Sequence, residues 1–259
     1  MDSSPWLLRR PGGGPVGLRL FCFPYAGGGA SPYAPWKRDL PAAVEVCPVQ
    51  LPGRENRLRE PAYTRIAPLI DATWDALRPY LDLPCALFGH SMGAFVAFEF
   101  ARRMRREGVP GPLRLFVSAH RAPHLPSPHP PIAHLPDGEF LAEVQQRYDG
   151  VPEEILREGD LIKLLLPTLR ADMALIEEYR CADEPPLECP VSALGGHDDR
   201  EAEAEELAAW RHHTSGPFSL DRFAGGHFYL RTAGAEVLAL IRRDLAAVVE
   251  PAVVTTSPR

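Results

Sequence analysis

Residues 87–93 read Leu87-Phe88-Gly89-His90-Ser91-Met92-Gly93, a G-x-S-x-G pattern between two segments of different hydrophobic periodicity. The run from Pro84 to Phe88 is short and apolar, as in a buried strand. Downstream, Ala94 to Arg106 repeats its apolar residues at helical spacing. A strand that passes directly into a helix through this pattern predicts a nucleophile elbow, in which Ser91 stands on a sharp turn above the carboxyl edge of a parallel sheet.

The glycines and the helix start are what such an elbow requires. Side chains at Gly89 and Gly93 would clash with neighbouring backbone in the turn. The helix that begins after Ser91 directs free N–H groups and the positive end of its dipole toward an oxyanion formed at the serine. The Met92 N–H is therefore the first predicted donor of an oxyanion hole.

Length and composition fit one α/β domain that carries a sizeable insertion. The chain has 259 residues, of which 45% are hydrophobic, enough for a substantial core. We expect a single domain over residues 16–250, with flexible segments at residues 1–15 and 251–259. The net charge of −6 argues against nucleic acid as a partner.

Other compositional features concern compartment and cysteine chemistry. No apolar run reaches the length of a membrane span, and the N-terminus lacks the apolar stretch of a signal peptide. We therefore expect a cytoplasmic protein without a membrane partner. The five cysteines include no C-x-x-C pair, which favours buried reduced thiols over disulfides or metal ligands.

Strand-like and helix-like segments alternate along most of the chain, which predicts a mostly parallel central sheet flanked by helices. The predicted strands are Leu18–Phe23, Val44–Val49, Cys85–Phe88, Leu113–Ser118, Val191–Gly195 and Ser219–Phe223. The predicted helices are Pro32–Asp39, Ile66–Leu81, Met92–Glu107, Ala202–His213 and Ala235–Val249.

One stretch, about residues 120–186, interrupts this alternation. A proline-rich approach, Ala122 to Pro136, leads into three predicted helices, Asp137–Arg147, Pro152–Glu158 and Asp160–Tyr179. An all-helical insertion between two sheet strands predicts a lid over the rim that carries Ser91.

A serine hydroxyl needs a base to take its proton, and the base needs an acid to fix its tautomer. In an elbow-bearing sheet the chain order is nucleophile, acid, histidine, each on a loop after a strand. His227 follows the last predicted strand after two glycines and is the predicted base. We expect His90 to point away from Ser91 into the flank of the sheet.

Two further groups of histidines are less well placed than His227 to act as the base. One group lies in the lid approach with irregular, proline-interrupted spacing that does not favour a metal site. It consists of His120, His124, His129 and His134. His212 and His213 end a polar helix, where we expect them to be solvated.

The acid is expected after the preceding strand, Val191–Gly195, where Asp198 and Asp199 are adjacent. Neighbouring side chains diverge, so only one carboxylate can meet His227, and the other is then a turn or helix-cap residue. The end of the strand alone leaves both candidates open.

Taken together, these residues resemble the type II thioesterases of polyketide and nonribosomal peptide biosynthesis, within the α/β-hydrolase superfamily. The resembling segments are Leu20–Gly29 with Trp36, Val49–Glu55, the elbow, Arg121–Pro123, Pro167–Asp172 and Gly225–Phe228. The family's G-x-x-D-P turn maps onto Gly196–Asp199 and implies Asp199 as the acid. Arg200 replaces the proline, so Asp198 stays the alternative.

The resemblance also implies the reaction and its partner. Ser91, His227 and Asp199 would hydrolyse acyl thioesters from the phosphopantetheine arm of an acyl or peptidyl carrier protein, with no metal or organic cofactor. The second oxyanion donor would be the Ala26 N–H, in a glycine-rich loop where backbone can approach the substrate closely. We expect a monomer.

Carrier proteins of this kind are generally acidic, so docking is expected to use local positive charge. Arg54, Arg57 and Arg59 follow the second predicted strand on the same rim as Ser91, and they are the predicted receiving cluster. A denser group lies at the far end of the elbow helix, where we interpret it as a solvated helix terminus. This group is Arg102, Arg103, Arg105 and Arg106.

The predicted lid helices also carry apolar residues that would pack against the sheet or line an acyl channel. They are Phe140, Leu141, Ile162, Leu165, Leu166, Leu169, Met173 and Ile176. Three other functions fit parts of the pattern: a small-molecule carboxylesterase or lipase, an acyltransferase on the same scaffold, and a non-catalytic binding module. Relative rates on thioesters and oxygen esters, and labelling of Ser91 by a fluorophosphonate, separate these functions.

Overall fold

The computed structural model describes residues 4–8, 16–148 and 159–254. Its centre is a six-stranded sheet in the order β2-β1-β3-β4-β5-β6, and every neighbouring pair is parallel. The strands are β1 (Leu18–Phe23), β2 (Val44–Pro48), β3 (Cys85–His90), β4 (Leu115–Ser118), β5 (Val191–Gly196) and β6 (Phe218–Phe223). Because all six run the same way, their carboxyl ends meet at one edge of the sheet, and loops after different strands converge there.

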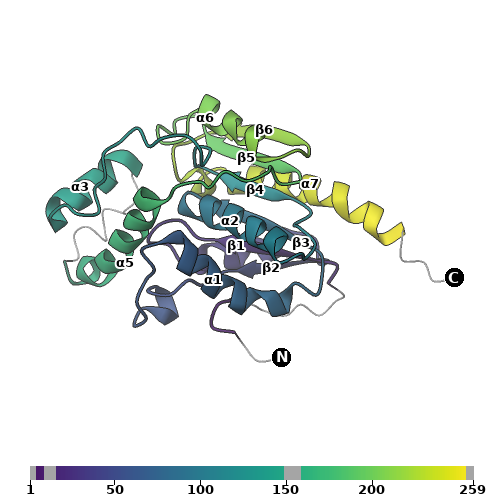
Figure 1. The fold of residues 1–259 in the computed structure, drawn as a ribbon, viewed down its shortest axis with the longest axis horizontal. Coiled ribbons are helices and arrows are strands. Elements are labelled where there is room, and N and C mark those ends of the chain that lie inside the picture. Colours follow the sequence, from purple (N-terminus) through teal and green to yellow (C-terminus); the bar gives the residue numbers. More distant parts are fainter. Residues whose placement is uncertain (1–3, 9–15, 149–158, 255–259) are drawn as a thin grey trace.

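Helices cover both faces of this sheet and a further pair stands apart (Figure 1). One face carries α1 (Ile66–Leu77), α2 (Met92–Arg106), α6 (Ala204–Ala208) and the 3₁₀ turn η4 (Ala209–His213). The other face carries the 3₁₀ helix η1 (Ser31–Arg38) and α7 (Gly234–Val254). The separate pair is α3 (Asp137–Tyr148) and α5 (Gly159–Glu178). Three short 3₁₀ turns complete the described elements: η2 (Glu55–Arg57), η3 (Arg78–Tyr80) and η5 (Tyr229–Arg231).

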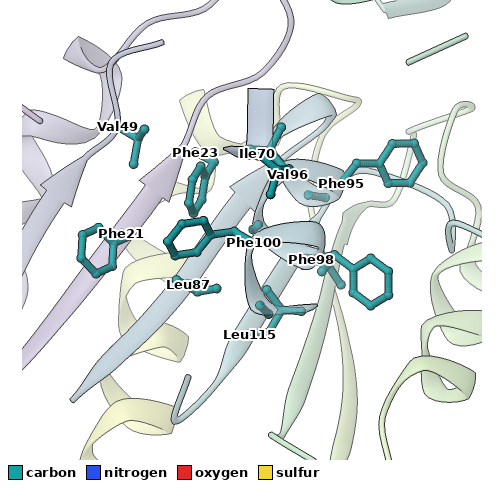
Figure 2. Close-up of a cluster of buried hydrophobic side chains, with 14 of the residues drawn as sticks. Phe21, Phe23, Val49, Ile70, Leu87, Phe95, Val96, Phe98, Phe100 and Leu115 are labelled. Atoms are coloured by element: carbon teal, nitrogen blue, oxygen red, sulfur yellow. The ribbon is translucent and has the colours of Figure 1, made fainter. Parts of the chain in front are cut away.

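The two faces of the sheet have separate cores because successive strand residues point to opposite sides. In β1, Phe21 and Phe23 belong to the core beneath α1 and α2, whereas Leu20 and Cys22 belong to the core beneath η1 and α7. Figure 2 shows the first of these cores, with Phe98 and Phe100 of α2 close to side chains of the strands. The sheet is thus buried on both faces, as expected of parallel strands.

The structure confirms the predicted α/β fold, and the predicted strands match the observed ones to within two residues at each end. β3 extends to His90, so the strand runs up to the serine itself. Lid helices α3 and α5 lie where the insertion was predicted, whereas the predicted helix Pro152–Glu158 falls outside the described residues. The lid has a small core of its own, formed by Ile132, Phe140, Val144, Leu166 and Met173.

The structure describes part of each terminal segment, and the flexibility of residues 1–15 and 251–259 stays a prediction. Residues 4–8 pack onto the domain: Leu7 is buried and pairs antiparallel with Val49, and the Trp6 ring lies 4.3 Å from the Arg57 guanidinium. α7 continues to Val254, into the predicted tail. Residues 1–3, 9–15 and 255–259 lie outside the described part. None of the helices in that part is long and apolar enough to cross a membrane.

Candidate active site

Ser91 occupies a strained turn between β3 and α2. Its backbone has φ 54° and ψ −121°, in a region that non-glycine residues rarely adopt. A Cβ on Gly89 would lie 1.9 Å from the Gly93 carbonyl oxygen, and a Cβ on Gly93 would lie 2.3 Å from the Phe23 carbonyl oxygen. Only glycine fits at either position. Because Gly93 has no side chain, the end of β1 lies directly against the start of α2.

Three buried side chains meet at this turn. His227 Nε2 lies 2.9 Å from Ser91 Oγ, and His227 Nδ1 lies 3.0 Å from Asp199 Oδ2. The carboxylate can only accept, so Nδ1 carries the hydrogen and Nε2 is left to accept from the serine hydroxyl. Asp199 Oδ1 also accepts the Glu201 N–H at 3.0 Å, which holds the carboxylate in its orientation.

The structure separates the two aspartates that the sequence left open. Asp199 is 4% exposed and contacts His227, whereas the side chain of Asp198 is exposed. The Asp198 N–H donates to the Gly225 carbonyl at 3.0 Å, which ties the acid loop to the histidine loop. The structure thus brings together Ser91, His227 and Asp199, and it leaves Asp198 outside the group.

The loop after β1, residues 24–29 and here called the oxyanion loop, lies beside the serine. A Cβ on Gly93 would be 2.8 Å from the Pro24 carbonyl oxygen, and Ala26 shares a cavity wall with Ser91 and His227. Within the described residues, neither the Ala26 N–H nor the Met92 N–H donates a hydrogen bond. Both groups are therefore available to a charged oxygen at the serine.

A cavity of about 190 Å³, here called the acyl cavity, opens at Ser91 and His227 beneath the lid. Its lid wall consists of Leu141, Val144 and Tyr148 of α3 and Ile162, Leu165, Leu166, Leu169, Met173 and Ile176 of α5. Of the apolar lid residues named from the sequence, only Phe140 is not part of this wall; it packs within the core of the lid. The wall is almost entirely apolar, as expected of a site for a hydrocarbon chain.

A second cavity, of about 610 Å³, lies on the lid-approach side of His227 and is lined by polar groups that include His120, His124 and His129. Burial lowers the pKa of His120 to about 3, so this imidazole is neutral at physiological pH. His212 is exposed as predicted, and His213 is half-buried, with its Nε2 2.7 Å from His124 Nδ1. In the described ranges, no group of three or more His, Cys, Asp or Glu side chains is arranged to hold a metal ion.

His90 is fully buried behind the site, where its Nδ1 lies 2.7 Å from Ser118 Oγ. Ser118 Oγ in turn lies 2.6 Å from the Tyr229 hydroxyl, and the His90 and His227 ring centroids are 5.5 Å apart. Burial lowers the pKa of His90 well below its usual value. A neutral ring therefore packs against His227 and adds no competing charge.

The predicted carrier-receiving cluster is wrong for two of its three arginines. Arg54 is 3% exposed and makes a bidentate ion pair with Asp172 of α5. Arg57 is 6% exposed and bonds to Glu60 and to the Gln50 carbonyl. Both guanidinium groups are bound to partners inside the protein. The sequence places these arginines at the rim of the sheet but does not reveal that pairing.

Within the group at the end of α2, Arg102 differs from its interpretation as part of a solvated terminus, whereas Arg106 is exposed. Arg102 is 2% exposed, with Glu99 Oε1 at 2.8 Å and Glu184 Oε1 at 3.0 Å. Arg105 and Arg106 contact the same Glu184. These cations hold the segment after the lid against the elbow helix.

A serine, a carboxylate and an imidazole on the loops after β3, β5 and β6 respectively, with a helical insertion above them, define the α/β-hydrolase class. A family model described as a thioesterase domain matches residues 18–245.

Curated relatives and solved structures agree with this match. Linear gramicidin dehydrogenase LgrE of Brevibacillus parabrevis is 42% identical over 248 residues, which cover 95% of this chain and 94% of that protein. Thioesterase PikA5 of Streptomyces venezuelae is 40% identical over 238 residues, covering 92% and 84%. The structure of the RedJ thioesterase, from the prodiginine pathway of Streptomyces coelicolor, superposes with a TM-score of 0.84 at 38% identity, covering 92% and 96%.

The chain belongs to the thioesterase family, and within it to the type II thioesterases of nonribosomal peptide and polyketide biosynthesis. The resemblance seen in the sequence is confirmed.

Proposed function

We propose that this thioesterase hydrolyses acyl groups from the phosphopantetheine arm of an acyl or peptidyl carrier protein, with Ser91 as nucleophile, His227 as base and Asp199 as the orienting acid. One observation supports these roles above all others. The Asp199–His227–Ser91 hydrogen bonds, at 3.0 and 2.9 Å, end at the mouth of the apolar acyl cavity. The nucleophile therefore lies next to a cavity that can hold the acyl chain.

In the first half of the reaction, Ser91 Oγ attacks the thioester carbonyl while His227 Nε2 takes the hydroxyl proton. Asp199 stays ionised and stabilises the imidazolium. The negative oxygen of the tetrahedral intermediate accepts hydrogen bonds from the Ala26 and Met92 N–H groups. The C–S bond then breaks, and the imidazolium gives its proton to the departing thiolate.

In the second half, water replaces the thiol. His227 takes a proton from the water, which attacks the ester carbonyl of the acyl-enzyme, and the same two N–H groups hold the second oxyanion. The C–O bond to Ser91 breaks as the imidazolium returns a proton to Oγ, and the free acid leaves. Each oxyanion donor lowers the activation free energy of such a step by about 3–4 kcal/mol.

Purified protein and carrier proteins loaded with acyl chains of graded length test this function. We expect the wild type to release free acids and Ser91→Ala to lose nearly all turnover while it unfolds at the wild-type temperature. Ser127→Ala, at a serine in the lid approach, is the matched control and retains activity. A fluorophosphonate is expected to label the wild type and Ser127→Ala but not Ser91→Ala.

The same panel separates the other functions of this scaffold. Faster turnover of small oxygen esters than of carrier thioesters would assign the protein to the carboxylesterases instead. Transfer of the acyl group to an added alcohol or amine in preference to water would indicate an acyltransferase. Absence of both labelling and turnover would leave a binding module.

A further inference from the structure

Asp172 connects the lid to the oxyanion loop. It lies on α5, is 1% exposed, and its Oδ2 accepts the Gly27 N–H at 2.7 Å. The same oxygen accepts Arg54 Nη1 at 2.9 Å, and Oδ1 accepts Arg54 Nη2 at 2.9 Å. A carboxylate of the lid helix is therefore bound at once to a buried cation and to a backbone amide next to Ala26.

Arg54 extends this connection to two more backbone groups. Its Nη1 also donates to the Gly28 carbonyl at 3.1 Å, and its Nε donates to the Pro52 carbonyl at 3.2 Å. The guanidinium thus joins the loop after β2, the oxyanion loop and α5. A Cβ on Gly27, which has φ +73°, would lie 3.1 Å from Leu169 Cδ1, so the lid helix lies close against this loop.

These bonds determine where the Ala26 N–H points. The Gly28 N–H donates to the Tyr25 carbonyl at 2.9 Å. In a trans peptide the C=O and N–H point in opposite directions, so the Ala26 N–H points away from the turn. Asp172 holds the next N–H of the loop and Arg54 holds the Gly28 carbonyl, while within the described residues the Ala26 N–H has no acceptor.

A buried ion pair contributes little net stability compared with apolar side chains of the same volume, so stability alone does not account for this pair. We propose that Asp172 and Arg54 are positioning residues that hold the oxyanion loop so that the Ala26 N–H faces the reacting carbonyl oxygen. Asp172 stands on the helix that also lines the acyl cavity, so one helix contributes both to the cavity wall and to the support of the oxyanion loop. This inference rests on the proposed role of Ala26 as an oxyanion donor.

The chain offers a matched control for burial and charge. Arg19 and Glu45 form another buried pair, with Arg19 Nε 2.9 Å from Glu45 Oε2, on neighbouring positions of β1 and β2. Arg19 is near the start of β1, at the opposite end of the strand from the oxyanion loop. Glu45→Ala therefore removes a buried acid from its arginine without touching that loop, and Arg19 keeps Asp82 as a second acidic partner.

Four variants are compared with the wild type: Asp172→Ala, Asp172→Asn, the double change R54M/D172L, and Glu45→Ala. The double change keeps the site filled and leaves no unpaired charge, so it tests positioning even where Asp172→Ala fails to fold. Asp172→Asn keeps an oxygen that can accept the Gly27 N–H. Each protein is assayed for kcat and KM on a chromogenic short-chain ester and on acyl-carrier thioesters, and for thermal unfolding.

The decisive readout is the affinity for two inhibitors. A trifluoromethyl ketone adds reversibly to Ser91 and places an oxyanion in the hole, whereas a thioether analogue of the substrate imitates only the ground state. In Asp172→Ala and R54M/D172L, we expect kcat to fall on the order of 10²–10³-fold, as for loss of one oxyanion donor. Ketone affinity falls in parallel, while KM and thioether affinity stay within about threefold. Asp172→Asn retains most of kcat, and Glu45→Ala loses stability only.

Two results would overturn the proposal. If the double change unfolds normally and keeps both kcat and ketone affinity, the pair is an anchor for the lid and nothing more. If ketone and thioether affinities fall together, the acyl cavity has collapsed and the oxyanion loop is not the cause. A wild type that cleaves esters but no carrier thioester would contradict the proposed function, and the ester and ketone measurements would still test the positioning role.

Discussion

The hydroxyl group of Tyr179 donates a 2.7 Å hydrogen bond to Glu99 Oε1 and so ties the end of the lid to the elbow helix. Tyr179 directly follows α5, and Glu99 lies on α2 two turns after Ser91. Glu99 is 8% exposed and also forms salt bridges with Arg102 and Arg106. The attachment of the lid therefore depends on a buried charge cluster in which each charged group is compensated by the others.

Removing one cation from this cluster leaves buried acids without their partner. We expect Arg102→Ala to lower the free energy of unfolding by about 3–5 kcal/mol, as for a broken buried pair. Arg103→Ala on the same helix, whose partners Asp71 and Glu107 are exposed, is expected to cost no more than about 1 kcal/mol. Urea unfolding followed by circular dichroism measures both changes, and equal effects would contradict the buried-cluster interpretation.

The acid of the proposed triad is tested by two neutral, nearly isosteric changes. Asp199→Asn cannot hold the His227 tautomer that accepts from Ser91, so kcat is expected to fall on the order of 10³–10⁴-fold. Asp198→Asn changes an exposed side chain and should leave kcat within about twofold. Steady-state rates on one acyl thioester decide between them, and the reverse pattern would transfer the role to Asp198.

The acyl cavity predicts how rate depends on chain length. Each methylene that enters an apolar wall contributes about 0.8 kcal/mol, so kcat/KM is expected to rise roughly fourfold per carbon until the cavity is full. Leu165→Trp fills part of the wall and should move the optimum to shorter chains. Leu164→Trp is the control, because Leu164 is 50% exposed on the same helix and lies outside the wall. An unchanged optimum in Leu165→Trp would show that the chain lies elsewhere.

His120 predicts an acid-sensitive contribution to stability. Its pKa is about 3 in the folded protein, through burial, and about 6.5 in an unfolded chain. Below about pH 6.5 the unfolded chain binds the extra proton, so the free energy of unfolding falls as the pH drops toward 3.

His120→Gln removes this effect. Between pH 7.5 and 5, the wild type should lose on the order of 1–2 kcal/mol more than this variant. The exposed His134 provides the control, since His134→Gln should keep the wild-type pH dependence. Urea titrations at the two pH values measure the difference, and an identical loss in all three proteins would contradict it.

Periodicity and glycine placement were sufficient to predict the sheet, the elbow and the order of the three loops. These features depend on neighbours close in sequence, and an apolar run before Gly89 has few alternatives to a buried strand. The choice between Asp198 and Asp199 was different in kind. It depends on the rotation of one turn, which is set by the Asp198 N–H bond to Gly225 in another loop.

Charge was where sequence reasoning failed. Arg54 was predicted on the correct rim but with its side chain in solvent, because its partner Asp172 lies 118 residues away on the lid. The burial of Arg102 was not predicted for the same reason, since its partner Glu184 lies beyond the lid in the sequence. Pairing between distant segments leaves no local pattern. The segment Pro167–Asp172 stood out only through the family resemblance, which did not reveal what its carboxylate binds.

The lid leaves the sheet after β4 and returns to β5, and these strands are hydrogen-bonded neighbours, with Ser118 opposite Leu194. An insertion whose two ends are adjacent can be replaced by another of different length without disturbing the strands that carry Ser91, Asp199 and His227. Grafting lids between relatives is therefore a practical route to altered acyl selectivity. Such a chimera must keep a carboxylate at position 172. Without it, the new lid would supply a different acyl cavity, but the oxyanion loop would lose its support and turnover would fall.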